Sequence, residues 1–303
     1  MSQSPLGRRA RVGWIDLAPF AFVVIWASGY VVAKAAAPYA EPLSFLVLRY
    51  AGVVVLMALL AALARAAWPA RRIDVLHLAV AGIGIQAIYL GGVWVAIRHG
   101  MPAGMAALIV NLQPVLTAVS GRLVGEQVAL RQWAGLALGF AGVALVVWSK
   151  LGGTGLRWGP VALAVLALLA ITGATLYQKR YIPHFDLRTG QVIQFVASAL
   201  VTLPLALAFE SFQIEWNAQV VAAMLWSVLV LSGGGISLLF LMIRHGAATA
   251  VTSYMYLVPA VTAVMAWAMF DERLSGLAMV GMVVTIAGVA LVVRRVPATL
   301  PRD

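Results

Sequence analysis

Polar and aromatic side chains are embedded in long apolar stretches of this 303-residue sequence, and their types could serve the binding of a small molecule. Trp26 and Tyr30 are four residues apart, and Gln86 and Tyr89 are three apart, so each pair shares one face of a helix. Polar groups within a membrane are costly unless they pair or line a cavity. The candidate binding residues are Trp26, Tyr30, Lys34, Gln86, Tyr89, Asn111, Gln113, Tyr177 and Tyr254.

The alternative role for these residues is ordinary helix packing, in which a hydrogen bond between membrane helices contributes only about 0.6 kcal/mol on average. The set as a whole favours a binding site, because several members lie close to the matched prolines Pro114 and Pro259. A proline in a helix frees a carbonyl group and permits a kink. We therefore interpret Pro114 and Pro259, together with Gly92 and Gly234, as candidate hinges.

Charged residues within or next to the apolar stretches have competing interpretations. Lys34 either attracts a substrate carboxylate or extends its side chain to the membrane interface. Arg49 is expected to extend outward in the same way or to pair with Glu41. Glu126 and Glu272 are each expected to complement the positive end of the helix that follows.

Catalytic motifs are absent from the sequence. It has no cysteine, no H-E-x-x-H, no G-x-S-x-G and no phosphate-binding loop. All ten carboxylates and all four histidines lie in predicted loops or near helix ends. We expect no enzymatic activity, no bound metal and no cofactor. A proton-coupled carrier generally needs a buried acid or histidine, so we also expect movement of the solute down its own gradient.

Composition indicates a polytopic membrane protein, because 63% of the residues are hydrophobic and only 10% are charged, against about 25% charged in soluble domains. A membrane-spanning helix needs about 20 predominantly apolar residues. That length predicts an all-α fold with ten transmembrane helices, at 14–37, 43–64, 74–97, 102–123, 132–149, 160–178, 189–209, 219–243, 247–270 and 275–294.

An internal duplication organises these ten helices. The string IRHG stands at 97–100 and again at 243–246, and AGVALVV stands at 141–147 and again at 287–293, both at an offset of 146 residues. We therefore predict two repeats of five helices, residues 1–150 and 151–303. An odd number of helices per repeat means inverted topology. A central cavity is expected between the repeats, lined by helices 1, 3, 4, 6, 8 and 9.

The net charge of +11 agrees with this topology. If the N-terminus is cytoplasmic, the cytoplasmic segments carry fifteen Lys and Arg residues and the opposite loops carry four. This positive-inside bias predicts that both termini are cytoplasmic. The partner of the basic residues is then the lipid bilayer and not a nucleic acid.

The chain resembles the EamA-type family of drug/metabolite transporters. The resemblance covers nearly the whole sequence and rests on Pro114 with Gly125–Glu126 and Gly142, and on Pro259 with Asp271–Glu272 and Gly288. Within that family it is most similar to bacterial inner-membrane exporters of aromatic amino acids. The resemblance implies a monomeric exporter of small organic solutes, such as aromatic or bulky apolar amino acids, that works by alternating access.

Two alternatives remain open. One is a multidrug or organic-cation exporter. The other belongs to a different class, namely an intramembrane enzyme or an assembly subunit without transport activity.

Overall fold

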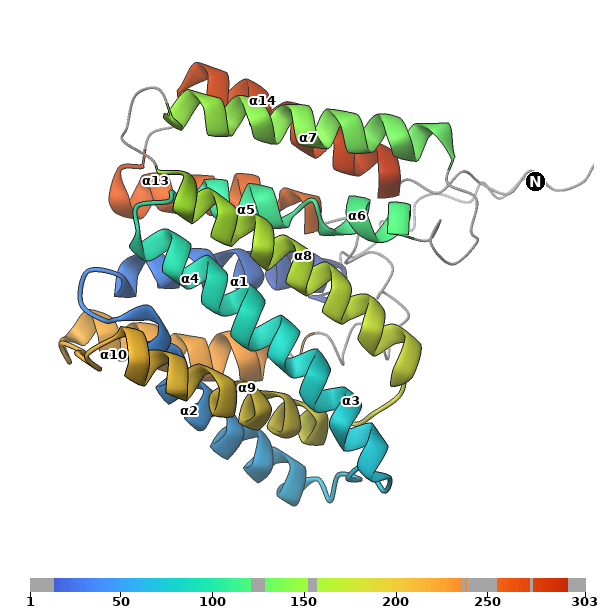
Figure 1. The fold of residues 1–303 in the computed structure, drawn as a ribbon, viewed down its shortest axis with the longest axis vertical. Coiled ribbons are helices and arrows are strands. Elements are labelled where there is room, and N and C mark those ends of the chain that lie inside the picture. The colour runs from blue at the N-terminus through green and yellow to red at the C-terminus, as the bar shows by residue number, and fades with distance from the viewer. Residues whose placement is uncertain are drawn as a thin grey trace, which may run out of the picture.

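The computed structural model describes residues 14–120, 129–151, 157–235, 238, 255–272 and 275–293, and these are almost entirely helical (Figure 1). The first half contains α1 (Trp14–Ala36), α2 (Pro42–Leu63), α3 (Arg72–Gly82), η1 (Ile83–Leu90), α4 (Gly91–Arg98), α5 (Ala103–Val110), α6 (Gln113–Ser120) and α7 (Leu130–Leu151). The second half contains α8 (Trp158–Tyr181), α9 (Leu187–Phe209), α10 (Ala218–Leu225), η3 (Trp226–Gly234), η4 (Met255–Leu257), α13 (Val258–Phe270) and α14 (Gly276–Val293).

The predicted fold class is confirmed, and the protein is an all-helical polytopic membrane protein. Within the described residues, seven helices are long and apolar enough to cross a membrane. Three shorter apolar helices, Ala218–Gly234, Val258–Phe270 and Gly276–Leu291, overlap the predicted eighth, ninth and tenth spans. Every one of the ten predicted ranges therefore contains helix in the part of the chain that is described.

Polar side chains cap the N-termini of several helices. They accept hydrogen bonds from the first backbone N–H groups, which have no partner within the helix and no water in apolar surroundings. The Asp186 side chain accepts a hydrogen bond from Arg188 N at the start of α9. Asn217 accepts from Val220 N in the same way at the start of α10. These caps set the boundary between the apolar spans and their short connections.

α7 and α14 form a closely packed pair along one edge of the molecule (Figure 1). A Cβ atom added to Gly142 would meet Thr285 Oγ1, and one added to Gly288 would lie 2.6 Å from Gly139 N. The two contacts are images of one another under the 146-residue offset. The earlier residue of α7, Gly139, faces the later residue of α14, Gly288, so α7 and α14 are antiparallel.

The other pairs of helices follow the same symmetry. α2 packs on α9, its counterpart in the second half. The packing of α1 on α13 matches the packing of α8 on α5 and α6. Because equivalent helices pack antiparallel, the two halves have inverted topology. The division at residue 150 remains a prediction.

Hydrogen bonds join two helix connections to each other on one face of the protein. We call the face on which α1 begins the N-terminal face. On the opposite face, Glu41 accepts hydrogen bonds of 2.9 Å from the backbone N–H groups of Ser211 and Gln213. In return, Glu210 accepts from Leu43 N at 2.9 Å and from Ser44 N at 2.7 Å. These reciprocal bonds hold the α1–α2 and α9–α10 connections together.

Candidate functional site

A cavity of about 290 Å³ lies between the two halves of the protein. Its lining comes from α1, α2, η1 and α4 of the first half, and from α8, α9 and η3 of the second. The lining also includes Phe185 and Leu187, so the cavity extends toward the α8–α9 connection at the N-terminal face. A volume near 300 Å³ is at the small end of ligand sites and suits one small solute.

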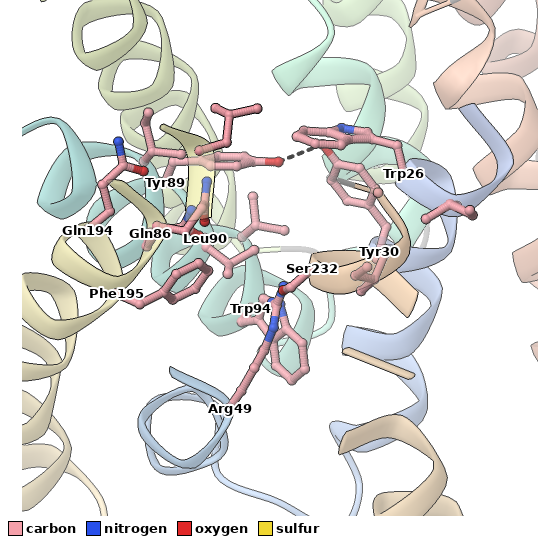
Figure 2. Close-up of a pocket in the computed structure, with 18 of the residues that line it drawn as sticks. Trp26, Tyr30, Arg49, Gln86, Tyr89, Leu90, Trp94, Gln194, Phe195 and Ser232 are labelled. Carbon is pink, nitrogen blue, oxygen red and sulfur yellow. Dashed lines mark hydrogen bonds between the residues drawn. The ribbon is translucent and has the colours of Figure 1, made fainter. Parts of the chain in front are cut away.

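Aromatic rings form much of the cavity wall (Figure 2). Trp26 and Tyr30 come from α1, Tyr89 from η1 and Trp94 from α4. The Tyr30 and Tyr89 hydroxyl groups lie 3.4 Å apart and join the two helices across the cavity. The Trp94 ring is supported from behind by Phe45, with ring centroids 4.7 Å apart. Such rings offer a large apolar surface with a polar handle.

Two π-helical segments, η1 and η3, lie at equivalent places in the halves and both line the cavity. π-helical turns are rare and often mark functional sites. The wider turn changes the backbone hydrogen bonding, and the Tyr50 hydroxyl donates a 2.6 Å hydrogen bond to Gln86 O. In η3, Ser232 Oγ donates to Ser227 O at 3.2 Å. Neither segment was predicted as π-helical from the sequence, although the candidate hinge Gly234 lies in η3.

Arg49 is a cavity residue whose role the sequence did not predict. Its residue surface is only 7% exposed and it lines the cavity. Its Nε atom has no hydrogen-bond partner, and among the described residues no carboxylate forms an ion pair with it. Both expected roles are therefore wrong. The side chain does not extend outward, and Glu41 instead binds the Ser211 and Gln213 N–H groups.

Amide side chains supply most of the other polar groups in the cavity. Gln86, Gln178, Gln191 and Gln194 all contribute to the lining. Gln194 Nε2 donates a 2.7 Å hydrogen bond to Gln178 Oε1 and links α9 to α8. Arg49 is the one charged side chain in the described lining.

Lys34 lies outside the cavity lining. Its Nζ atom is 2.9 Å from Glu272 Oε1 at the opposite face, which satisfies the charge of both groups. The second Glu272 oxygen accepts from Ala103 N at 3.2 Å. The expectation that Glu272 complements the helix following it is therefore wrong, because it caps the start of α5.

Three further candidate residues are also outside the lining. The Asn111 residue is 8% exposed and lies at the break between α5 and α6. Gln113 Nε2 donates to Thr175 Oγ1 at 3.2 Å. The Tyr177 hydroxyl lies 2.7 Å from His77 Nδ1. Tyr254 lies outside the described residues. The structure thus gathers Trp26, Tyr30, Gln86 and Tyr89 in the cavity and places Lys34, Asn111, Gln113 and Tyr177 outside its lining.

The candidate hinges occupy distinct positions. Pro114 is the second residue of α6, just after the break at Asn111 and Leu112, and Pro259 is the second residue of α13. Gly92 permits close packing of α4 on α8, because an added Cβ would lie 3.1 Å from Leu163 O. Gly234 ends the π-helical segment η3.

The cavity is lined by partly different helices from those predicted. The second predicted span contributes Arg49 to the lining, and the seventh contributes Gln191, Gln194 and Phe195. No residue of α5, α6 or α13 contributes to the described lining. Within the described ranges, no three His, Asp or Glu side chains are grouped to hold a metal ion.

Inverted helical halves around a small aromatic cavity define a membrane carrier. The chain belongs to the EamA-like transporter family, whose pattern it matches twice, at residues 13–148 and 158–294. These two matches also confirm the predicted duplication.

Individual relatives agree with this assignment. The chain is 28% identical to the transporter YvbV of Bacillus subtilis over 279 residues, which cover 89% of this chain and 88% of the relative. It is 25% identical to a protein of Escherichia coli strain K12 named "Probable amino-acid metabolite efflux pump", over 88% of this chain and 90% of the relative. A solved crystal structure shares the fold, with a TM-score of 0.63, 17% identity, and coverage of 92% of this chain and 96% of that one.

Proposed function

We propose that this protein exports aromatic or other bulky apolar amino acids, or closely related small organic solutes, across a bacterial inner membrane. The observation that carries the proposal is the aromatic cavity between the inverted halves, with Trp26, Tyr30, Tyr89 and Trp94 in its wall. Two relatives carry the name "Probable amino-acid metabolite efflux pump", which supports amino acids and related metabolites as the solutes.

The conformation of the cavity supports export by alternating access. Its lining extends toward the N-terminal face, while on the opposite face the Glu41 and Glu210 hydrogen bonds hold the α1–α2 and α9–α10 connections together. If the N-terminus is cytoplasmic, as the charge distribution predicts, this cavity would accept solute from the cytoplasm. We propose that a single chain carries out this cycle.

The polar lining supports facilitated movement without ion coupling. No Asp, Glu, His or Lys is part of the described lining, so it lacks a group that cycles between charge states near neutral pH. The direction of transport would then follow the cytoplasmic accumulation of the solute. Residues for an enzyme are likewise missing from this lining, which favours a carrier over an enzyme.

Transport by the purified protein in liposomes tests the proposal. Labelled tryptophan and phenylalanine are expected to enter protein-containing vesicles faster than empty ones, with threonine slower. Uptake should show no accumulation driven by an imposed pH difference at clamped membrane potential. Preferential uptake of methyl viologen would instead support an organic-cation exporter. Uphill accumulation that a protonophore abolishes would contradict the facilitated mechanism.

A further inference from the structure

The depth of Arg49 within the membrane makes its charge costly. It lies seven residues after Pro42, the first residue of α2, or about 10 Å along the helix at 1.5 Å per residue. Arginine keeps its charge at physiological pH. A buried charge of this kind normally marks a substrate pathway unless it is paired.

Two carboxylates near the start of α2, Glu41 and Glu210, already have other partners. Glu41 accepts hydrogen bonds from two backbone N–H groups of the α9–α10 connection. Glu210, which packs against the start of α2, accepts from Leu43 N, Ser44 N and Ser44 Oγ. The charge of Arg49 is therefore left uncompensated within the described structure, and Nε is a buried donor without an acceptor.

The Arg49 side chain faces the cavity and not lipid. It belongs to the cavity lining, and its residue surface is only 7% exposed. Figure 2 shows it extending from α2 into the group formed by the labelled aromatic residues. A bound solute could therefore reach the guanidinium group while its apolar body contacts the rings of Trp94 and Tyr30.

From this geometry we propose that Arg49 binds a carboxylate group of the transported solute. This inference rests on the proposed function and narrows its substrate class to aromatic or apolar carboxylates. A guanidinium group binds carboxylates with two parallel hydrogen bonds. Because the described lining holds no Asp or Glu, an ammonium group on the solute is not required. Deaminated aromatic acids are then ligands as well as amino acids.

Four indole compounds distinguish recognition of a carboxylate group from recognition of an ammonium group. Tryptophan has both a carboxylate and an ammonium group, indole-3-propionate has only the carboxylate, and tryptophanamide and tryptamine have only the ammonium group. Binding is measured as the ligand-dependent rise in the midpoint of thermal unfolding of the detergent-solubilised protein. We expect tryptophan and indole-3-propionate to bind about 10-fold or more tightly than the other two compounds.

Substitutions of Arg49 assign this preference to the guanidinium group. Arg49→Met removes the charge at similar length and is expected to weaken binding of both carboxylates by about 10- to 100-fold. The ligand-free protein should unfold at the same or a higher temperature, because an uncompensated buried charge is removed. Arg49→Lys keeps the charge without the planar fork and should bind with intermediate affinity. Arg98→Met, at the exposed end of α4, is the matched control and should bind as the wild type does.

Three results would overturn the inference. Equal binding of tryptamine and indole-3-propionate by the wild-type protein would show that the carboxylate is not recognised, whether or not transport occurs. Unchanged binding of indole-3-propionate by Arg49→Met would assign recognition to other residues. Transport of methyl viologen with no binding of any indole compound would reject the proposed substrate class together with this inference. If Arg49→Met fails to fold, the four-compound comparison on the wild type and on Arg49→Lys decides the question.

Discussion

The hydroxyl groups of Tyr30 and Tyr89 lie 3.4 Å apart and connect α1 to η1 across the wall of the cavity. Both rings also face the space in which we place the solute. The contact is long for a hydrogen bond between two hydroxyl groups, which usually measures about 2.7–2.8 Å. The rings are therefore expected to matter more to solute binding than the hydroxyl contact does.

Substitutions at Tyr30 and Tyr89 separate these two contributions. Tyr30→Phe and Tyr89→Phe keep the ring and should change the KM for tryptophan by no more than about threefold. Tyr30→Ala and Tyr89→Ala remove ring contacts worth about 0.5–1.5 kcal/mol beyond buried area, so KM should rise by about 3- to 10-fold or more. Initial uptake rates into liposomes measure this. Trp216→Ala, in the exposed α9–α10 connection, is the control and should leave KM unchanged. Unchanged KM in both alanine variants would place the site elsewhere.

The hydrogen bond from the Tyr50 hydroxyl to Gln86 O, at 2.6 Å, is expected to stabilise the π-helical segment η1. Tyr50→Phe leaves this carbonyl without its partner and should lower the free energy of unfolding by about 0.5–1.5 kcal/mol. Denaturant unfolding in mixed micelles measures the change. Tyr39→Phe, in the middle of the α1–α2 connection, is the comparison and should be near neutral. A Tyr50→Phe protein as stable as the wild type would show that η1 does not depend on this bond.

Much of the fold can be predicted from the sequence. The lengths of the apolar runs predict the helices, and the repeated strings with an odd number of helices per repeat predict the inverted halves. Trp26, Tyr30, Gln86 and Tyr89 also follow from helical spacing. Arg49, Trp94 and Phe195 do not, because their direction depends on how α2, α4 and α9 are rotated against their neighbours. Lys34 illustrates the same difficulty, since its partner Glu272 lies 238 positions further along the chain. The π-helical segments depend on packing and have no recognised sequence signal.

The equivalent glycines Gly142 and Gly288 test the inverted packing of α7 and α14. Gly142→Ala and Gly288→Ala would each drive a Cβ atom into the backbone of the partner helix. Overpacking of this kind costs about 1–3 kcal/mol, so both variants should unfold at lower temperature and by similar amounts. Gly173→Ala in α8 has no atom within 4 Å of its new Cβ and should be neutral or stabilising. Destabilisation by only one of the two variants would contradict the symmetric packing.

Closure of the opposite face offers a direct test of alternating access. Ala40 and Ile214 form an isolated antiparallel bridge between the α1–α2 and α9–α10 connections. Residues paired in this way have Cα atoms about 4.5–5.5 Å apart, which is within the range of about 4.4–6.8 Å that a disulfide needs. The natural chain has no cysteine, so a pair introduced there has no competing thiol.

The most direct measurement is tryptophan uptake by the double variant Ala40→Cys and Ile214→Cys in liposomes, before and after oxidation, with the two single variants as controls. If the cavity is a transport site that must open on both faces, the oxidised double variant should carry no tryptophan above the rate of empty vesicles. Reduction with dithiothreitol should restore its uptake, and the single variants should be unaffected by either treatment. Uptake by the fully cross-linked protein at the rate of the reduced protein would contradict the account.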